Sequence, residues 1–416
     1  MSLTRDTPFD SVSLEQLRRR RSERWAKYPA DVLPSFYAEM DFAPAPAISA
    51  ALAGAIADGD LGYAHGAKSG LGDAFAGFAS RRWGWEVDPA AVTAVPDVMV
   101  GVAELLRGLT EPGAGVVVNT PVYPPFFSVV AETGRRAVEV PLLDADTGRR
   151  LPIEGIRAAF AEGTRALLLC NPHNPTGYVP QRDELLAVAE LVAEYDGLVL
   201  SDEIHAPLTL AGATHVPFCS LPGAAAERAI TLTSASKGWN LAGLKCGLAV
   251  AGSERMRGAL AALPPDLSDR VGHLGVLANE TAFAAGEPWL DELLAYLEET
   301  RSWLPGLLAE RVAQVRYEPG QATYLAWLDF RALGLGDDPA AHLLEHGRVA
   351  LASGPEFGKL GRGFARLNVG TSRALVEQAV DRIARALVQA ERDAQVRRPD
   401  GRTETMGSCS ERSELP

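Results

Sequence analysis

One lysine, Lys237, has a sequence environment that could give its amine unusual chemistry. It follows the apolar run 229–233 through the hydroxyl-rich turn Ser234-Ala-Ser236, and a second apolar run starts at Leu248. This pattern predicts that Lys237 lies in a loop at the end of a buried strand. A lysine in such a loop is usually solvated, because burial of an unpaired ammonium is costly. The alternative is a desolvated amine with a lowered pKa, able to form a Schiff base with an aldehyde cofactor.

Polar residues follow two further apolar runs. The run 166–170 leads into Asn171-Pro-His-Asn-Pro-Thr-Gly177, which predicts a rigid turn with a candidate cis bond at Asn174–Pro175. The run 197–201 leads into Asp202-Glu-Ile-His205. Open α/β sheets bind ligands at the carboxyl ends of their strands, so Asp202 is the strongest acidic candidate for a site.

Three other residues have both a structural and a functional interpretation. Arg366, in the predicted strand 364–369, either faces solvent or aims its guanidinium at a carboxylate. Tyr123, in the loop 120–127, fills a turn or covers a flat cofactor. Tyr63 lies in a glycine-rich loop that is a simple turn or presents its hydroxyl to a ligand.

Charged segments near the N-terminus leave similar alternatives open. The run 18–21 contains four arginines and is either a solvated face or a patch for phosphate or nucleic acid. Glu39 and Asp41 give polarity to a loop or shape the rim of a pocket. A helix predicted from Met99 to Leu109 would expose N–H groups at its start, which suit an anion such as phosphate.

The order of the elements predicts an α/β protein. Strands and helices alternate from 93 to 250, which indicates a mainly parallel sheet covered by helices. A long helix with proline in its first turn is predicted from 288, followed by short strands of a smaller α+β domain. We expect an N-terminal segment (1–49) that joins the small domain, a large domain (50–287), the small domain (288–394) and a disordered tail (395–416).

Composition limits the function classes. The 416 residues are 47% hydrophobic and carry a net charge of -13, which argues against nucleic acid or an anionic membrane as the main partner. Four scattered cysteines show neither metal-ligand nor disulfide spacing, so we expect no metal site. Without a signal peptide or an apolar run near the ~20 residues of a membrane span, the expected location is the cytoplasm.

Taken together, these motifs resemble the pyridoxal-phosphate enzymes of fold type I, in the aminotransferase class I/II superfamily, over roughly residues 14 to 390. The chain is most similar to the branch of MalY/PatB-type cystathionine β-lyases, or cysteine C–S lyases. The features that carry this resemblance are Ala38-Glu-Met-Asp-Phe42, Thr120-Pro-Val-Tyr-Pro-Pro-Phe126, Asn174-Pro-Thr-Gly177, Ser201-Asp-Glu-Ile-His205, Ser234-x-Ser-Lys237, Tyr324-Leu-Ala-Trp-Leu-Asp329 and Arg366-Leu-Asn368.

The resemblance implies a large domain with a mainly parallel seven-stranded sheet, a smaller α+β domain and a role for each site residue. Lys237 would form the Schiff base with pyridoxal phosphate and then take the proton from the substrate Cα. Asp202 would pair with the pyridine nitrogen, and Arg366 would bind the substrate carboxylate. Further predicted cofactor contacts are Val98, Met99, Ser234, Ser236 and Lys245 at the phosphate, Tyr123 stacked on the ring, and Asn174 and His205 at the ring hydroxyl. Asn174, Tyr123 and Asp41 are also predicted to contact substrate.

The resemblance also implies partners and a reaction. Tyr63 would reach the phosphate of a neighbouring subunit, which implies a homodimer with shared sites. The reaction favoured by the branch is β-elimination from an L-cysteine thioether, giving a thiol, pyruvate and ammonia. Transamination, a decarboxylating or oxidative reaction of a cysteine conjugate, and a regulatory role that only binds cofactor remain alternatives.

Three positions depart from the pattern expected for this branch. Gly238-Trp-Asn240 replaces Thr-Phe-Asn, which would alter the wall beside the ring. Lys245 stands where many aminotransferases have arginine, so it would bind phosphate as a point charge. Glu39 replaces a common aspartate. These changes bear on the substrate rather than on the cofactor.

Overall fold

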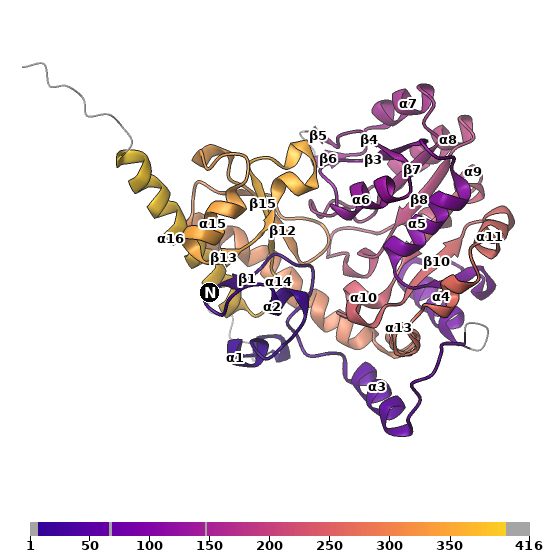
Figure 1. The fold of residues 1–416 in the computed structure, drawn as a ribbon, viewed down its shortest axis with the longest axis horizontal. Coiled ribbons are helices and arrows are strands. Elements are labelled where there is room, and N and C mark those ends of the chain that lie inside the picture. The colour runs from indigo at the N-terminus through magenta and orange to yellow at the C-terminus, as the bar shows by residue number, and fades with distance from the viewer. Residues whose placement is uncertain (1–6, 66–68, 146–147, 397–416) are drawn as a thin grey trace, which may run out of the picture.

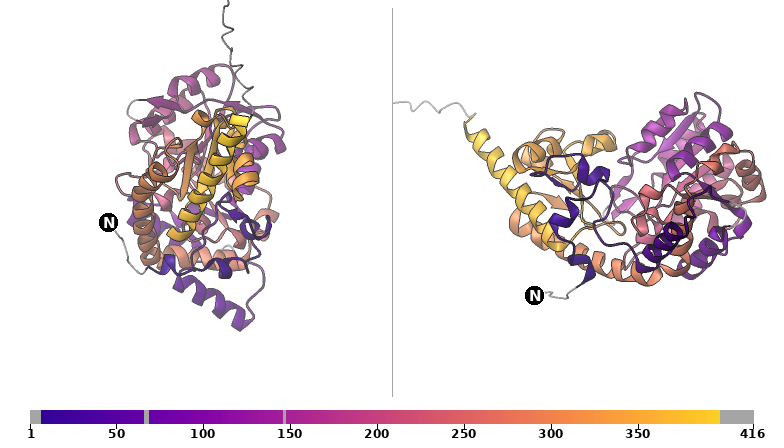
Figure 2. Two further views of the ribbon diagram at one scale, coloured as in Figure 1. Left: turned by 90° about the vertical axis from the view of Figure 1, so that its left-hand side faces the viewer. Right: turned by 60° about the horizontal axis from the view of Figure 1, so that its bottom comes forward.

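The computed structural model describes residues 7–65, 69–145 and 148–396. These residues form two halves that lie side by side, one built on a seven-stranded sheet and the other on a four-stranded sheet (Figures 1 and 2). The tail predicted to be disordered begins at 395, but residues 395 and 396 are helical; from 397 onward the tail lies outside the described residues. Within the described part of the chain, no helix combines the length and apolar character needed to cross a membrane.

The seven-stranded sheet confirms the predicted α/β architecture. Its strand order is β2-β10-β9-β8-β7-β3-β4. All neighbouring strands from β9 to β4 are parallel, whereas β10 is antiparallel to both β9 and β2. The strands are β2 (Val92–Val95), β3 (Gly115–Val118), β4 (Arg136–Glu139), β7 (Ala166–Cys170), β8 (Leu198–Asp202), β9 (Ala229–Thr233) and β10 (Gly247–Ala251).

Helices cover both faces of this sheet, and its inner strands are buried at every position. Val116 and Val118 of β3 pack in one core cluster with α5, α6 and α11, whereas Val117 packs in the other with α4, α7, α8 and α13. The helices of this half are α3 (Pro46–Asp58), α4 (Leu71–Trp83), α5 (Val98–Leu109), α6 (Pro125–Glu132), α7 (Ile153–Ala161), α8 (Arg182–Glu194), α9 (Ala224–Glu227), α10 (Ala235–Gly238), α11 (Glu254–Ala261), α12 (Asp266–Asp269) and α13 (His273–Ala285).

The start of α5 differs from its prediction. The strand expected to run to Val98 ends at Val95, and Val98 is already the first residue of the helix. Asp97 precedes the helix, and its Oδ1 accepts a hydrogen bond from the Val100 N–H at 2.9 Å. This cap fixes the helix start next to the strand end.

The second half consists of a small antiparallel sheet and the helices packed on it. The long helix α14 (Glu287–Arg311) leads into it, and the strand order is β11-β12-β15-β14. The elements are β11 (Arg316–Tyr317), β12 (Leu325–Asp329), α15 (Pro339–Gly347), β14 (Ala352–Ser353), β15 (Phe364–Asn368) and α16 (Arg373–Val396). A short antiparallel hairpin is formed by β5 (Leu143–Ala145) and β6 (Gly148–Arg150).

The N-terminal segment crosses to this second half. It contains α1 (Leu14–Leu17), α2 (Glu23–Ala26) and β1 (Leu33–Pro34), and β1 pairs in parallel with β13 (Val349–Ala350). Figure 1 shows the indigo segment beside the orange one. Strand pairing therefore attaches the start of the chain to an element more than 300 residues later.

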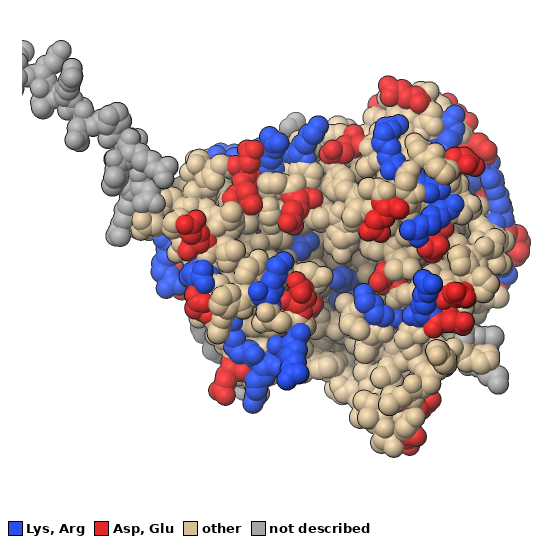
Figure 3. All heavy atoms as spheres, in the orientation of Figure 1, with Lys and Arg blue, Asp and Glu red and all other residues tan. Residues whose placement is uncertain are grey.

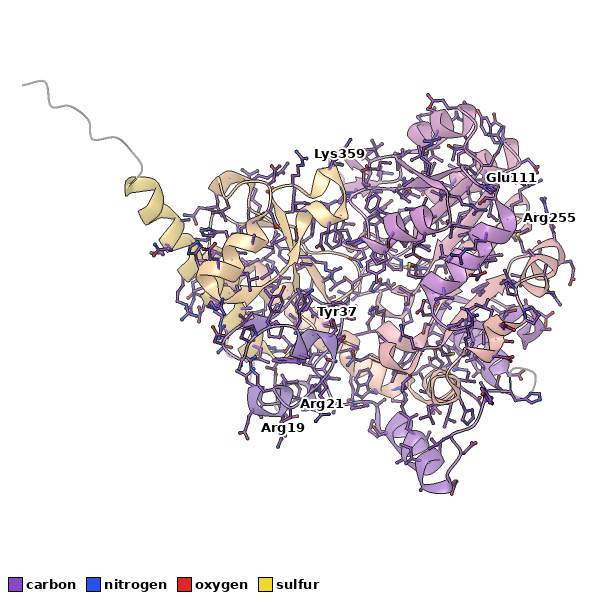
Figure 4. The ribbon with its side chains drawn as sticks, viewed as in Figure 1. Arg19, Arg21, Tyr37, Glu111, Arg255 and Lys359 are labelled. Atoms are coloured by element: carbon purple, nitrogen blue, oxygen red, sulfur yellow. The ribbon has the colours of Figure 1, made fainter. Side chains whose placement is uncertain are left out.

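Two arginines of the run 18–21 make hydrogen bonds within the fold, and the other two are exposed to solvent. Arg18 Nη2 donates to the Val32 carbonyl at 3.1 Å, and Arg20 Nη2 donates to the Asp41 carbonyl at 2.8 Å. Arg19 and Arg21 are exposed at the outer surface (Figure 4). Alternate arginines thus fasten the N-terminal segment, and the others form the solvated face.

Asp41 has a structural role that argues against the predicted substrate contact. Its carboxylate lies 2.9 Å from Arg24 Nη2, and both side chains are only 2% exposed. Trp25 Nε1 donates to Asp41 Oδ1 at 2.7 Å. A buried guanidinium requires an anionic partner, so this carboxylate is committed to Arg24.

Asp41→Ala should lower the free energy of unfolding by about 3 kcal/mol, because it leaves the Arg24 guanidinium buried without its counter-ion. Urea denaturation followed by circular dichroism measures this loss. The control is Asp31→Ala, which removes a 2.7 Å ion pair with Arg348 between side chains that are 62% and 44% exposed. The control should cost no more than about 1 kcal/mol. Equal losses in both variants would contradict the structural role of Asp41.

Candidate functional site

A cavity lies at the carboxyl ends of β7, β8 and β9, where the two halves meet. The space-filling view shows this face hollowed between the halves (Figure 3). Arg366 lines an adjoining cavity, and Tyr63 and Asp41 line neither. The predicted site residues that line the first cavity are Val98, Met99, Tyr123, Asn174, Asp202, His205, Ser234, Ser236, Lys237 and Lys245.

Lys237 lines this cavity and is largely buried in its wall. It lies in the one-turn helix α10 rather than in a loop, and Ser234 caps that helix by accepting the Ser236 N–H at 3.0 Å. The Lys237 Nζ donates to the Ala38 carbonyl at 2.9 Å. Burial, reinforced by the positive charge of Arg366, lowers the pKa of Lys237 to about 8. A neutral, nucleophilic amine is therefore accessible near physiological pH.

Asp202 is the carboxylate that faces the cavity. It ends β8, and burial raises its pKa to about 7. Glu203, the next residue, is saturated by structural contacts that leave it no role in the cavity. Its oxygens lie within hydrogen-bond distance of Ser201 Oγ (2.8 Å), Phe218 N (2.8 Å), His215 Nε2 (3.1 Å) and Thr231 Oγ1 (3.2 Å).

Two neutral side chains lie beside this carboxylate. Burial lowers the pKa of His205 well below its usual value, and its buried Nδ1 has no partner among the described residues. Asn174 follows β7, and the peptide bond before Pro175 is cis, as predicted. The imidazole of His205 therefore offers the cavity a nitrogen that a ligand could contact.

Arg366 is buried, which excludes the solvent-facing interpretation. It is 5% exposed because β15 lies between β12 and β14 in the small sheet. Its Nη1 donates to Asn174 Oδ1 and its Nη2 donates to the Phe36 carbonyl, both at 2.9 Å. The buried Nε has no partner, and the guanidinium carbon lies 5.0 Å from the Phe357 ring centroid.

The same burial lowers the pKa of Arg366 to about 10. Its guanidinium remains a cation at neutral pH, with one N–H unsatisfied in a cavity wall. A carboxylate ligand would satisfy that N–H and compensate the buried charge.

The opposite end of the cavity suits an anion. The first N–H groups of α5, at Val98 and Met99, have no acceptor within the helix. Ser236 and Lys245 also line this end, and Lys245 Nζ lies 3.1 Å from Asp97 Oδ2. Backbone donors, a hydroxyl and an ammonium thus converge on one region of the cavity.

The hydroxyl of Ser234 is less available than predicted. It donates to the Cys246 carbonyl at 2.7 Å and caps α10, so its proton is already used. Trp239, expected beside the ring, does not line the cavity: its side chain is fully buried and its Nε1 donates to the Gly286 carbonyl at 2.9 Å. Ser234 and Trp239 thus lie at the two ends of α10, as its N-cap and C-cap residues.

Sequence reasoning missed several residues that line the cavity, among them Asp97 and Tyr37. Asp97 is detectable as a helix cap three residues before Val100, a spacing typical of N-caps. Tyr37 lines both cavities and lies at the seam between the halves (Figure 4). No local pattern marks Tyr37, because its position depends on the N-terminal segment folding back over the site.

Tyr123 also lines both cavities. Burial raises its pKa to about 12, so the phenol keeps its proton at neutral pH. The wall between the two cavities is therefore aromatic and can donate a hydrogen bond.

The arrangement supports a defined chemistry. An amine of lowered pKa stands between an anion-binding end, a carboxylate that could face a cationic ring nitrogen, and a buried arginine that can bind a carboxylate. Such a set suits covalent capture of a carbonyl compound and proton transfer at a carbon atom bound close to the amine.

Comparison with known proteins agrees with this geometry. The model of the family "Aminotransferase class I and II" matches residues 41–383. A relative from Mycobacterium leprae is 44% identical over 405 residues, covering 92% of this chain and 98% of that protein. The cystathionine beta-lyase of Corynebacterium glutamicum is 38% identical over 377 residues, covering 90% and 99%.

A solved structure extends the similarity to the fold. The crystal structure of cystalysin from Treponema denticola, which contains a pyridoxal 5'-phosphate cofactor, aligns with a TM-score of 0.82 and 26% identity. The alignment covers 89% of this chain and 97% of that one. With a family model matched over most of its length and relatives above one third identity, the chain belongs to the aminotransferase class I and II family, as its motifs predicted.

Proposed function

We propose that this protein is a pyridoxal-phosphate-dependent carbon–sulfur β-lyase. Its substrate would be L-cystathionine or a related S-conjugate of L-cysteine, and its products a thiol, pyruvate and ammonia. The observation that carries the proposal is the amine of Lys237, with its lowered pKa, between Asp202 and Arg366. The choice of β-elimination is supported by relatives named as cystathionine beta-lyases.

The cavity residues fit pyridoxal phosphate. Its phosphate group would be held by the N–H groups of Val98 and Met99, with Ser236 and Lys245. Its pyridine nitrogen would face Asp202, whose raised pKa reflects a buried carboxylate that lacks a full counter-ion. The unpartnered Nδ1 of His205 lies in the same wall. When bound, the cofactor withdraws electrons from the substrate Cα.

The residues of the chain supply binding and proton transfer. Arg366 would bind the substrate α-carboxylate with its free Nε–H, while Asn174 and the Phe36 carbonyl hold the guanidinium in place. Lys237 would move the proton from Cα, and the Ala38 carbonyl orients its Nζ. The Cβ–S bond then breaks, and the electron pair leaves with sulfur. One water balances the reaction of the thioether to thiol, pyruvate and ammonium.

We also infer a homodimer with shared sites. Tyr63 is 91% exposed, and Ile56 and Leu61 nearby are 58% and 61% exposed. These apolar groups lie on and after α3, which projects from the body and shows little charge along its length in Figure 3. A second copy that covers this surface would let Tyr63 contact the partner's phosphate site.

Two coarser inferences complete the proposal. The two separate sheets support a division into a segment at 1–49, a large domain at 50–287 and a small domain at 288–394, although the bounds at 49 and 394 fall inside α3 and α16. A reducing, cytoplasmic location is supported by Cys170, Cys219 and Cys246, which are free thiols.

Purified protein supplied with pyridoxal phosphate should release pyruvate, ammonia and thiol from L-cystathionine. Lys237→Ala should reduce pyruvate release at least about 100-fold, because it removes the group that transfers the Cα proton. A coupled lactate dehydrogenase assay measures pyruvate, and circular dichroism checks the fold of the variant. If pyruvate stays at background while an added 2-oxo acid becomes an amino acid, the protein is an aminotransferase instead.

Covalent capture of pyridoxal phosphate by the cofactor-free protein should accelerate from pH 6.5 and level off above about pH 8. The sign follows from the lowered pKa of Lys237, about 8: its amine is protonated below this value and nucleophilic above it. Borohydride reduction at timed intervals, followed by peptide mass spectrometry, measures the label on Lys237. The reaction of free Nα-acetyl-lysine, whose pKa is about 10.4, with pyridoxal phosphate should continue to accelerate beyond pH 9. Identical profiles would contradict the lowered pKa.

Shared sites predict complementation between two inactive proteins. Lys237→Ala and Tyr63→Ala homodimers should each have little activity, since one lacks the amine and the other the partner contact. Subunit exchange should restore about a quarter of wild-type activity, because half of the dimers carry one intact site. Pyruvate release before and after exchange in mild denaturant measures the recovery. Absence of recovery, with heterodimers verified by differential tags, would show that Tyr63 acts within its own subunit or not at all.

A further inference from the structure

A second cavity continues from the first. The two share Tyr37, Ala38, Tyr123 and Lys237, and the second runs on between the small half and the N-terminal segment. Arg366, with its buried and unpartnered Nε, lines only the second cavity. A substrate whose α-carboxylate lies at Arg366 and whose Cα lies near Lys237 has this cavity available for its side chain.

Most of the wall is apolar. Phe36 and Ala350, together with Val32, form a separate core cluster against which Tyr28, Leu344 and Ala352 pack. All of these except Val32 line the second cavity. Leu351 and Phe357 extend the same lining. Such a wall suits the methylene groups and the sulfur of a thioether.

Besides Lys237 and Arg366, which lie where the two cavities adjoin, three charged side chains interrupt the apolar wall: Lys27, Asp338 and Glu356. Lys27 is already engaged: its Nζ lies 3.9 Å from Glu23 Oε1 and 5.0 Å from the Phe36 ring centroid. Asp338 and Glu356 have no hydrogen bond or ion pair within the described part of the chain. Away from Arg366 and Lys237, the charge that lacks a partner in this cavity is therefore negative.

Asp338 is the better placed of the two carboxylates. It immediately precedes α15, in a position where aspartate commonly caps a helix, yet its side chain makes no cap hydrogen bond. Its Oδ1 is buried and without a partner in the described structure. Glu356 is exposed and lies near enough to Arg366 to raise the pKa of that guanidinium.

We propose that the second cavity binds the departing half of the substrate, and that Asp338 selects a leaving thiol that carries an ammonium group. This inference rests on the proposed lyase function, which it extends from the reaction to its substrate class. The preferred substrates are L-cysteine thioethers with a protonated amine beyond the sulfur, a class that includes cystathionine. The ammonium remains on the released thiol and takes no part in the cleavage of the Cβ–S bond.

Three small thioethers of similar length isolate the effect of charge. S-(2-aminoethyl)-L-cysteine carries an ammonium, S-propyl-L-cysteine is neutral, and S-carboxymethyl-L-cysteine carries a carboxylate. For the wild type we expect kcat/KM to fall in that order. In Asp338→Asn, the ratio of kcat/KM for the aminoethyl compound to that for the propyl compound should fall about tenfold. The carboxymethyl compound should improve relative to the propyl compound.

The matched control is Asp337→Asn. Asp337 is the preceding residue, lies outside both cavities and pairs with Arg362 at 3.4 Å between exposed side chains. Its neutralisation removes the same charge from the same loop, so both ratios should stay at their wild-type values. Glu356→Gln neutralises the other carboxylate of the second cavity, at an exposed position. It should shift both ratios in the same direction as Asp338→Asn but by a smaller factor.

The outcomes distinguish a failure of the selection by Asp338 from a failure of the lyase function. Pyruvate from all three compounds with ratios unchanged in Asp338→Asn would overturn the selection by Asp338 and leave the lyase function standing. No pyruvate from any compound with the wild type would overturn the lyase function and the subsite together. General destabilisation of the Asp338 variant cannot produce the expected result, because it would lower turnover of all three compounds rather than improve the carboxymethyl compound relative to the propyl one.

Discussion

The burial of Lys237 next to Arg366 is the interaction on which the rest of the site depends. Lys237 and Arg366 line a continuous space that has Asp202 as its deeply buried carboxylate. Each pays a desolvation penalty, which lowers the pKa of Lys237 to about 8 and that of Arg366 to about 10. The penalty weakens the fold and at the same time makes the amine nucleophilic. Anionic groups of a cofactor and a substrate would relieve it, so the cavity is matched to ligands that carry phosphate and carboxylate.

The N-terminal segment connects this electrostatic arrangement to both halves of the molecule. The Ala38 carbonyl accepts from Lys237 Nζ of the large half and from Tyr324 Oη of the small half, both at 2.9 Å. Asn240 of the large half donates to the Met40 carbonyl at 2.8 Å, and Asn368 of the small half donates to the Glu39 carbonyl at 2.6 Å. A shift between the halves must therefore disturb the acceptor that orients Lys237.

The sequence predicted what depends on local pattern and left open what depends on packing. Apolar runs located Asp202 and Lys237 at strand ends, because a buried strand is apolar throughout and its first polar residue marks its edge. The same reasoning could not place Arg366, since a strand residue faces solvent or core according to its neighbours in the sheet. The pairing of Asp41 with Arg24 could not be predicted for a related reason: the two residues are 17 positions apart, and no local pattern links them.

The neighbouring carboxylates in this chain show which observation distinguishes a structural acid from one that faces a ligand. Glu203 has four donors and Asp41 has an arginine and an indole, so neither has capacity for a ligand. Asp202 accepts one backbone N–H, at 3.1 Å from Ile204, and Asp338 accepts none. A buried carboxylate oxygen without donors is unfavourable unless a ligand supplies them. Asp338 Oδ1 meets this criterion, and Asp202 has only one donor, so under the proposed function Asp202 would face the cofactor and Asp338 the departing thiol.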